Sequence, residues 1–101
     1  MNLDMNKAEG IDFLQDLQDF INARRKEMTK DTYTTRLFES GINKIAQKVG
    51  EEAVELIIEA KDQNDDLFLN ESADLMYHFI VLLAAKGYRL ENVVQVLKLR
   101  H

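Results

Sequence analysis

The stretch KVGEEAVELIIEA, residues 48–60, decides the fold that we expect for this chain. Its apolar residues recur at helical spacing, which predicts part of an α-helix running from about 42 to 61. One face of this helix is apolar, and the charged side chains share another face. Such a density of negative charge beside an apolar face needs a reason, and the next helix suggests one. The charged face holds Lys44, Lys48, Glu51, Glu52, Glu55 and Glu59.

A second long helix is expected over 66–86, and its second half is almost entirely apolar or aromatic. We therefore expect that half to be buried most of the way round. Glu71, Asp74 and His78 interrupt the apolar pattern and share one stripe at i, i+3 and i+7. Ionised carboxylates in a buried helix are costly unless they are paired or bind a metal.

The turn between the two helices is short, so the helices should lie antiparallel and adjacent. Glu52 and Glu55 can then face Glu71 and Asp74. A cluster of hard oxygen ligands suits Mg²⁺, with Mn²⁺ as a possible substitute, and does not suit zinc. The spacing therefore predicts a metal site between the two helices.

Two cations extend this hypothesis toward a reaction. Lys44 and Lys48 lie one and two turns before the carboxylates, where they could hold phosphate oxygens. Mg²⁺ commonly bridges to substrate phosphates and helps to generate a hydroxide nucleophile. The pattern indicates metal-assisted hydrolysis of a phosphoanhydride.

Ordinary explanations exist for each of these residues. Glu51 and Glu59 also fit solvated helix positions, and Lys48 with Glu52 also fits a simple i, i+4 ion pair. An isolated pair of glutamates at this spacing carries little information, and the signal comes from the second acidic pair on an apolar helix. Two further side chains of that helix fit the core or a subunit contact as well as a ligand site: Tyr77 and His78.

The composition bounds the remaining possibilities. The chain has 101 residues, no proline, four glycines and no cysteine, which favours one helical domain with short connections. The lack of cysteine excludes disulfides, thiolate zinc sites and cysteine nucleophiles. A net charge of −5 disfavours a broad nucleic-acid surface. No apolar run approaches about 18 residues, so we expect no membrane span.

The expected fold class is all-α with about five helices. Besides the two long helices, helices are expected at 11–25, from 32 or 33 to 41, and from 90 to the C-terminus. Residues 1–10 are expected to form a flexible N-terminal tail, and 11–101 a single domain.

Apolar residues outside the core face predict an oligomer. Val54 and Ile58 belong to neither the apolar nor the charged face of the first long helix. Together with the apolar girth of the second long helix, they exceed what one neighbouring helix can cover. We therefore expect a homodimer that buries helices from both chains in one core.

The acidic pairs also resemble a known signature. EEAVE (51–55) followed by ESAD (71–74) resembles the E-E-x-x-E … E-x-x-D motif of the MazG-like, all-α nucleotide pyrophosphatases. The wider stretches YTTRLFESGINKIAQKVGEEAVE (33–55) and NESADLMYHFIVLLAAKGYRLENVVQVLKLRH (70–101) are more specifically similar to the phosphoribosyl-ATP pyrophosphatase family. This resemblance covers about 13–101.

The resemblance implies a cytoplasmic, helical and usually dimeric enzyme of histidine biosynthesis. Its small-molecule nucleotide substrate would be phosphoribosyl-ATP, hydrolysed with Mg²⁺ at the α–β phosphoanhydride to phosphoribosyl-AMP and pyrophosphate. It also implies roles for individual residues: metal ligands Glu52, Glu55, Glu71 and Asp74; a part in catalysis for Glu51, Glu52 and Glu55, with Glu51 either supporting the metal ligands or positioning water; and contacts to substrate phosphates from Arg36, Lys44 and Lys48.

Three alternatives stay open at this point. The first is a house-cleaning MazG-like enzyme that acts on free nucleoside triphosphates. The second, from another class, is a non-catalytic helical dimerisation module with exposed Glu71 and Asp74 and no affinity for Mg²⁺. The third concerns the chain itself, because the family also occurs fused behind a phosphoribosyl-AMP cyclohydrolase domain. The polar start could therefore be a native terminus or the boundary of a longer parent chain.

Overall fold

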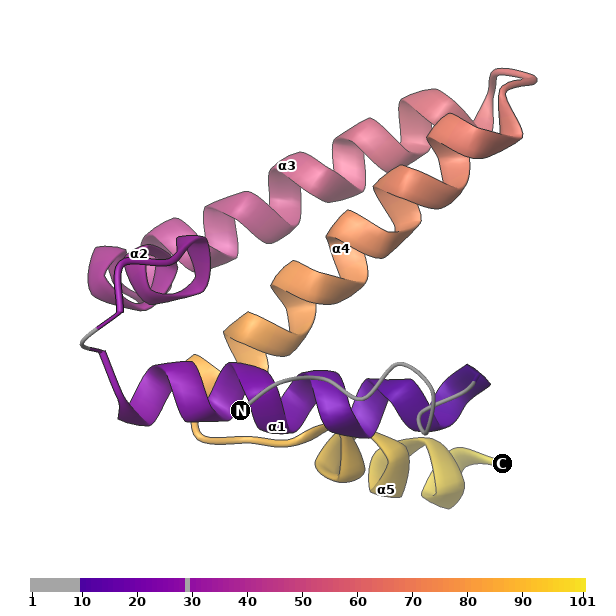
Figure 1. The fold of residues 1–101 in the computed structure, drawn as a ribbon. Coiled ribbons are helices and arrows are strands. Elements are labelled where there is room, and N and C mark those ends of the chain that lie inside the picture. The colour runs from indigo at the N-terminus through magenta and orange to yellow at the C-terminus, as the bar shows by residue number, and fades with distance from the viewer. Residues whose placement is uncertain (1–9, 29) are drawn as a thin grey trace.

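A computed structural model describes residues 10–28 and 30–101, which form five α-helices and one short 3-10 helix (Figure 1). No strand occurs within these two ranges, so the prediction of an all-α fold is confirmed. Each expected helix is present, with ends within two residues of the expected ones. The elements are η1 (Gly10–Asp12), α1 (Phe13–Lys26), α2 (Tyr33–Ser40), α3 (Ile42–Ala60), α4 (Asp65–Ala85) and α5 (Leu90–Arg100).

The expected tail falls almost wholly outside the described residues. Of residues 1–10, only Gly10 is described, and it begins η1 with a φ of 59°. The division into a flexible tail and one domain therefore stays a prediction.

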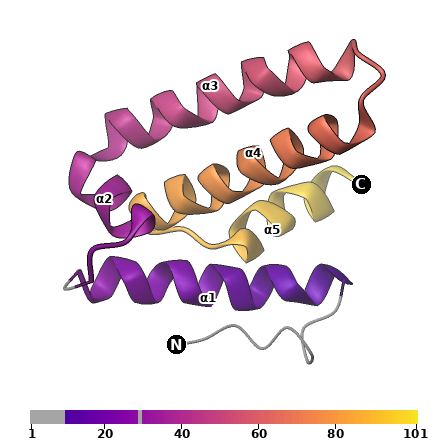
Figure 2. The ribbon, with the colours of Figure 1, turned by 45° about the horizontal axis from the view of Figure 1, so that its top comes forward.

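Helices α3 and α4 form a long antiparallel hairpin (Figures 1 and 2). The turn between them places Asn64 at the N-cap of α4, where its side chain accepts a hydrogen bond from the Leu67 amide at 3.1 Å. This side-chain cap satisfies one of the amides that a helix start leaves unpaired. The short, capped turn fixes α4 beside α3, as the sequence predicted.

The core lies where α1 and α2 pack against the inner ends of the hairpin. Gly41, with a φ of 91°, joins α2 to α3 through a single residue in a conformation that favours glycine. This tight joint brings α2 against α3, while α1 packs on the second half of α4. The buried apolar residues come from all four of these helices: Ile21, Leu37, Ile45, Ile80, Val81 and Ala84.

Polar contacts fix the start of α5 on α1. The Gln18 side chain, which is buried, accepts a hydrogen bond from the Leu90 amide and donates one to Glu91 at 2.9 Å. Arg89 pairs with Glu91 at 2.8 Å and with Asp19 at 3.0 Å. The position of α5 therefore depends strongly on charged and amide side chains.

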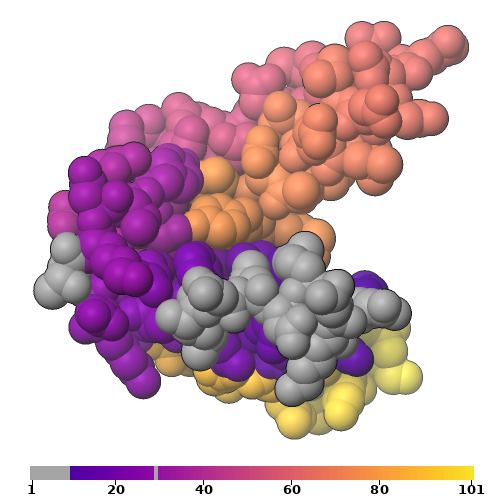
Figure 3. All heavy atoms as spheres, in the orientation of Figure 1, coloured from indigo at the N-terminus to yellow at the C-terminus, as the bar shows by residue number. Residues whose placement is uncertain are grey.

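The outer half of the hairpin projects away from the other helices (Figure 3). In consequence, the expected apolar core face of α3 is only partly buried in the single chain. Ile45 is buried, whereas Ile42 and Ile57 are 42% and 56% exposed. The expectation for α4 holds better, since its second half is buried or half-buried except at Met76. Periodicity alone could not show which of these apolar positions lacks a covering helix.

By length and composition alone, α4 could cross a membrane. The core helix of a soluble protein passes the same test, and α4 packs against α1, α2 and α3. Glu71 and Asp74 also place two carboxylates within the helix. These features identify α4 as the central helix of the fold.

Candidate active site

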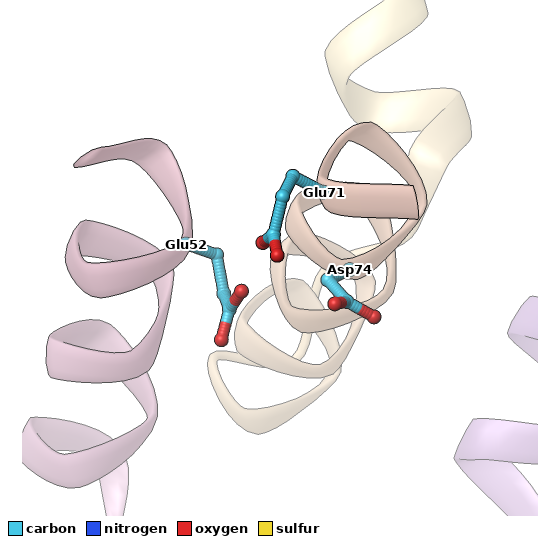
Figure 4. Close-up of side chains that lie close together, drawn as sticks. All are labelled: Glu52, Glu71 and Asp74. Atoms are coloured by element: carbon cyan, nitrogen blue, oxygen red, sulfur yellow. The ribbon is translucent and has the colours of Figure 1, made fainter. Parts of the chain in front are cut away.

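Three acidic side chains converge in the middle of the hairpin. Glu52 reaches from α3 toward α4, where Glu71 points back toward it and Asp74 lies alongside (Figure 4). One carboxylate oxygen from each of these residues lies within 4.8 Å of the others. Glu52 and Glu71 are half-buried, whereas Asp74 is exposed. The structure thus brings together three of the four ligands that the sequence predicted.

Glu71 has the least favourable surroundings of the three. Its Oε2 atom is buried and has no hydrogen-bond partner in the described part of the chain. Burial, followed by the neighbouring carboxylates of Glu52, Asp74 and Glu55, raises the pKa of Glu71. A cation would relieve both the crowding and the missing partner, and oxygen ligands of this kind suit Mg²⁺. The residues present therefore fit a hard divalent cation.

Glu55 lies outside this group of three. It is exposed on α3, one turn after Glu52, and it is close enough for its charge to raise the pKa of Glu71. Its role as a ligand stays a prediction.

The interpretation of Glu59 as an ordinary solvated residue is wrong. This side chain is half-buried, and its Oε2 atom is buried without a partner among the described residues. The reason is helical geometry: position 59 follows 52 by seven residues, so both share the face of α3 that packs on α4.

Lys48 connects the carboxylates to a neighbouring cleft. Its Nζ atom lies 3.3 Å from Glu52 and 3.6 Å from Glu51, and the contact with Glu52 is the main cause that raises the pKa of Lys48. The cleft has a volume of about 350 Å³ and contains the three cations predicted to bind phosphate. Its lining residues are Tyr33, Arg36, Leu37, Ser40, Lys44, Lys48 and Glu51.

The other predicted residues sit at the rim of this cleft. Arg36 is exposed and pairs with Asp31 at 2.7 Å, while Lys44 lies one turn before Lys48 on α3. Glu51 is exposed and also accepts a hydrogen bond from Gln47 at 3.3 Å. The structure therefore groups the predicted cations in the cleft, where Lys48 contacts Glu52 of the acidic cluster.

Three lining residues were missed from the sequence, Tyr33, Leu37 and Ser40. A signal was present, because positions 33, 36, 37 and 40 share one face of α2 at i, i+3, i+4 and i+7. That face lines the cleft, but the docking of α2 on α3 was needed to show it.

The sequence matches the phosphoribosyl-ATP pyrophosphohydrolase family over residues 14–101. It is 58% identical over 93 residues to the histidine biosynthesis bifunctional protein HisIE of Bacteroides thetaiotaomicron. These aligned residues make up 92% of this chain and 46% of that protein. It is 52% identical over 89 residues to the HisIE protein of Xylella fastidiosa strain Temecula1. These aligned residues make up 88% of this chain and 43% of that protein. The chain thus spans less than half the length of these relatives.

A shorter relative matches from end to end. The phosphoribosyl-ATP pyrophosphatase of Leptospira biflexa is 40% identical over 91 residues, which cover 90% of this chain and 99% of that protein. The acidic signature, the all-α hairpin that carries it and these matches agree with one another. The chain belongs to the phosphoribosyl-ATP pyrophosphohydrolase family.

Proposed function

We propose that this chain hydrolyses the α–β phosphoanhydride of phosphoribosyl-ATP, giving phosphoribosyl-AMP and pyrophosphate, the second step of histidine biosynthesis. The family supplies the reaction. One structural observation carries the assignment of the site: the carboxylates of Glu52, Glu71 and Asp74 converge next to a cleft that contains three cations. Hydrolysis of a polyphosphate needs both charge types side by side.

The carboxylates would hold Mg²⁺, or Mn²⁺ in its place, with Glu55 as a fourth ligand. The orphaned oxygen of Glu71 and its raised pKa support this assignment, since both mark a site with surplus negative charge. A bound divalent ion supplies charge neutralisation for the phosphates and lowers the pKa of bound water.

The side chains of the cleft would place the substrate. Arg36 and Lys44 bind phosphate oxygens at the rim through charge-assisted hydrogen bonds. Lys48, held 3.3 Å from Glu52, brings the phosphate chain to the edge of the acidic cluster. Glu51 lies beside Lys48 at the same edge, where it either accepts a proton from the attacking water or orients that water.

Assembly and context belong to the same proposal. The outer half of the hairpin exposes apolar side chains that a second copy would cover, including Val54 at 56% and Ile58 at 55% exposure. We expect a cytoplasmic homodimer. Because relatives are bifunctional proteins of about twice this length, we also expect the domain to occur joined to a phosphoribosyl-AMP cyclohydrolase.

Turnover of a substrate panel tests the proposal. The chain, incubated with Mg²⁺, should release pyrophosphate from phosphoribosyl-ATP with a kcat/KM at least about 100-fold above that for ATP, dATP or dUTP, a difference of about 2.7 kcal/mol. Preference for a free triphosphate would favour the house-cleaning alternative. No hydrolysis of any compound, together with no Mg²⁺ binding by calorimetry, would favour the non-catalytic module.

A further inference from the structure

Tyr33 and His78 form a contact between α2 and α4 that the proposed chemistry leaves unused. The Tyr33 hydroxyl lies 2.6 Å from His78 Nε2, and the two rings meet edge to face with centroids 5.7 Å apart. His78 is only 6% exposed. Its other ring nitrogen, Nδ1, lies 2.7 Å from the backbone carbonyl oxygen of Asp74.

For a neutral imidazole, these partners set the direction of the hydrogen bond. A backbone carbonyl only accepts, so Nδ1 of His78 must carry a proton and donate it. In the neutral ring, Nε2 is then an acceptor, and the Tyr33 hydroxyl must donate to it. The single proton of Tyr33 is thereby committed to His78, and the oxygen offers only lone pairs to its remaining surroundings.

The contact joins the two halves of the site. Tyr33 lines the cleft that contains Arg36, Lys44 and Lys48, whereas His78 follows the acidic Asp74 by one turn of α4. A second tie lies beside it, because the Thr34 hydroxyl hydrogen-bonds to the Tyr77 hydroxyl. Two side-chain hydrogen bonds thus join the α2 wall of the cleft to α4, the helix that carries two of the carboxylates.

We propose that Tyr33 is a positioning residue, held by His78, that fixes the position of the phosphate-binding cleft relative to the carboxylate cluster. The hydrogen bond to His78 holds the Tyr33 ring in place, and with it the α2 wall of the cleft. This inference rests on the proposed function, because it assigns a role within that site. Misplacement by about 1 Å can cost a reaction about 100-fold, so a small shift of this wall should be visible in turnover.

Four variants test the inference: Tyr33→Phe, His78→Leu, the double variant and His78→Gln. Tyr33→Phe and His78→Leu should each lower kcat for phosphoribosyl-ATP by at least about tenfold, with KM changed by less than about threefold. The reason is that the contacts to phosphate remain, whereas the alignment of the bound phosphates with the carboxylate cluster is lost. The double variant should be no worse than the more affected single one, since both break one contact. His78→Gln keeps an acceptor for Tyr33 and should exceed His78→Leu by at least about tenfold in kcat.

Tyr88→Phe is the matched control, because Tyr88 is an exposed tyrosine that lines a different groove, between α4 and α5. It should retain the wild-type kcat. Thermal melts identify any variant that fails to fold, and Tyr33, being 45% exposed, is the safer of the two positions. An active wild type with an equally active Tyr33→Phe variant would overturn this inference alone. A wild type that does not hydrolyse phosphoribosyl-ATP would instead overturn the proposed function.

Discussion

At Glu71, one carboxylate oxygen distinguishes the acidic face of the hairpin from an ordinary solvated surface. This oxygen is buried without a partner among the described residues, and its neighbours include other carboxylates. Without a cation, the cluster should destabilise the fold through repulsion and desolvation. A bound divalent cation would instead use the same carboxylates as ligands.

Glu55→Gln separates binding from folding. The amide keeps the size of the side chain but removes a charge that lies beside the cluster, so Mg²⁺ binding should weaken if Glu55 is a ligand. We expect phosphoribosyl-ATP turnover to fall at least about 100-fold, or about 2.7 kcal/mol, while the metal-free melting temperature stays equal or rises. Glu39→Gln, an exposed change on α2, is the control and should match the wild type. Equal turnover by both variants at limiting Mg²⁺ would show that Glu55 is no ligand.

Glu91 makes the attachment of α5 sensitive to acid. Hydrogen bonds from Arg89 and then Gln18 lower its pKa from 4.5 to about 2. Because the folded-state pKa is depressed, this contribution to stability is present above about pH 4.5 and is lost as the pH falls toward 2. Glu91→Gln should therefore lower the melting temperature near neutral pH, and its difference from the wild type should narrow below about pH 4.5. A difference that stays constant across this range would contradict the assignment, and Glu39→Gln again serves as the control.

The sequence could predict residues whose roles follow from spacing along one helix. Glu71 and Asp74 are of this kind, since positions i and i+3 share a face, and the short turn between α3 and α4 allowed Glu52 to be placed opposite them. The partnership of Tyr33 with His78 is not, because it joins residues 45 apart and depends on how α2 docks against α4. Glu59 was misjudged because its burial depends on how α3 packs against α4.

At the scale of elements, local signals were sufficient for the helices and their ends. Thr32 and Asn64 cap α2 and α4, each accepting a backbone hydrogen bond at 3.1 Å, and Gly87 follows α4 with a φ of 82°. Residues of these types are recognisable in the sequence as signals for where a helix begins or ends. The turn after α3 was correctly predicted for the same reason.

Asn64→Ala tests the cap on which the hairpin turn depends. Loss of the side-chain acceptor leaves the Leu67 amide without its partner and should cost about 1 kcal/mol of the free energy of unfolding. For a domain of this size, the melting temperature should fall by about 4–8 °C. Gln63→Ala, in the same exposed turn, is the matched control. A melting temperature for Asn64→Ala equal to that of the control would mean that the cap does not stabilise α4.

In the molecule as a whole, the outer half of the hairpin exposes apolar side chains that no other described part of the single chain covers. Val54, Ile57 and Ile58 on α3 are each more than half exposed, and Leu69 on α4 is 62% exposed. A monomer rarely leaves so much apolar surface contiguous. The sequence predicted the excess of apolar surface but could not show that it gathers at one end of the hairpin.

A homodimer formed through this surface should therefore be stable. Sedimentation at micromolar concentration should give the mass of two 11.7 kDa chains, with an interface of about 2,000 Å² or more in total. Ile58→Asp should shift the equilibrium toward the monomer, because it places a charge in the apolar contact. The exposed change Glu39→Gln should leave the mass unchanged. A wild-type chain that sediments as a monomer would contradict the prediction.

The proposed function requires the carboxylates between α3 and α4 to serve the hydrolysis of phosphoribosyl-ATP. The most direct test is the initial rate of pyrophosphate release from phosphoribosyl-ATP by Asp74→Asn, measured over a Mg²⁺ titration beside the wild type. Asp74 is exposed, so the variant should fold, and its rate at saturating Mg²⁺ should be at least about 100-fold below that of the wild type. The same rate and the same Mg²⁺ dependence in both proteins would show that Asp74 takes no part in this reaction.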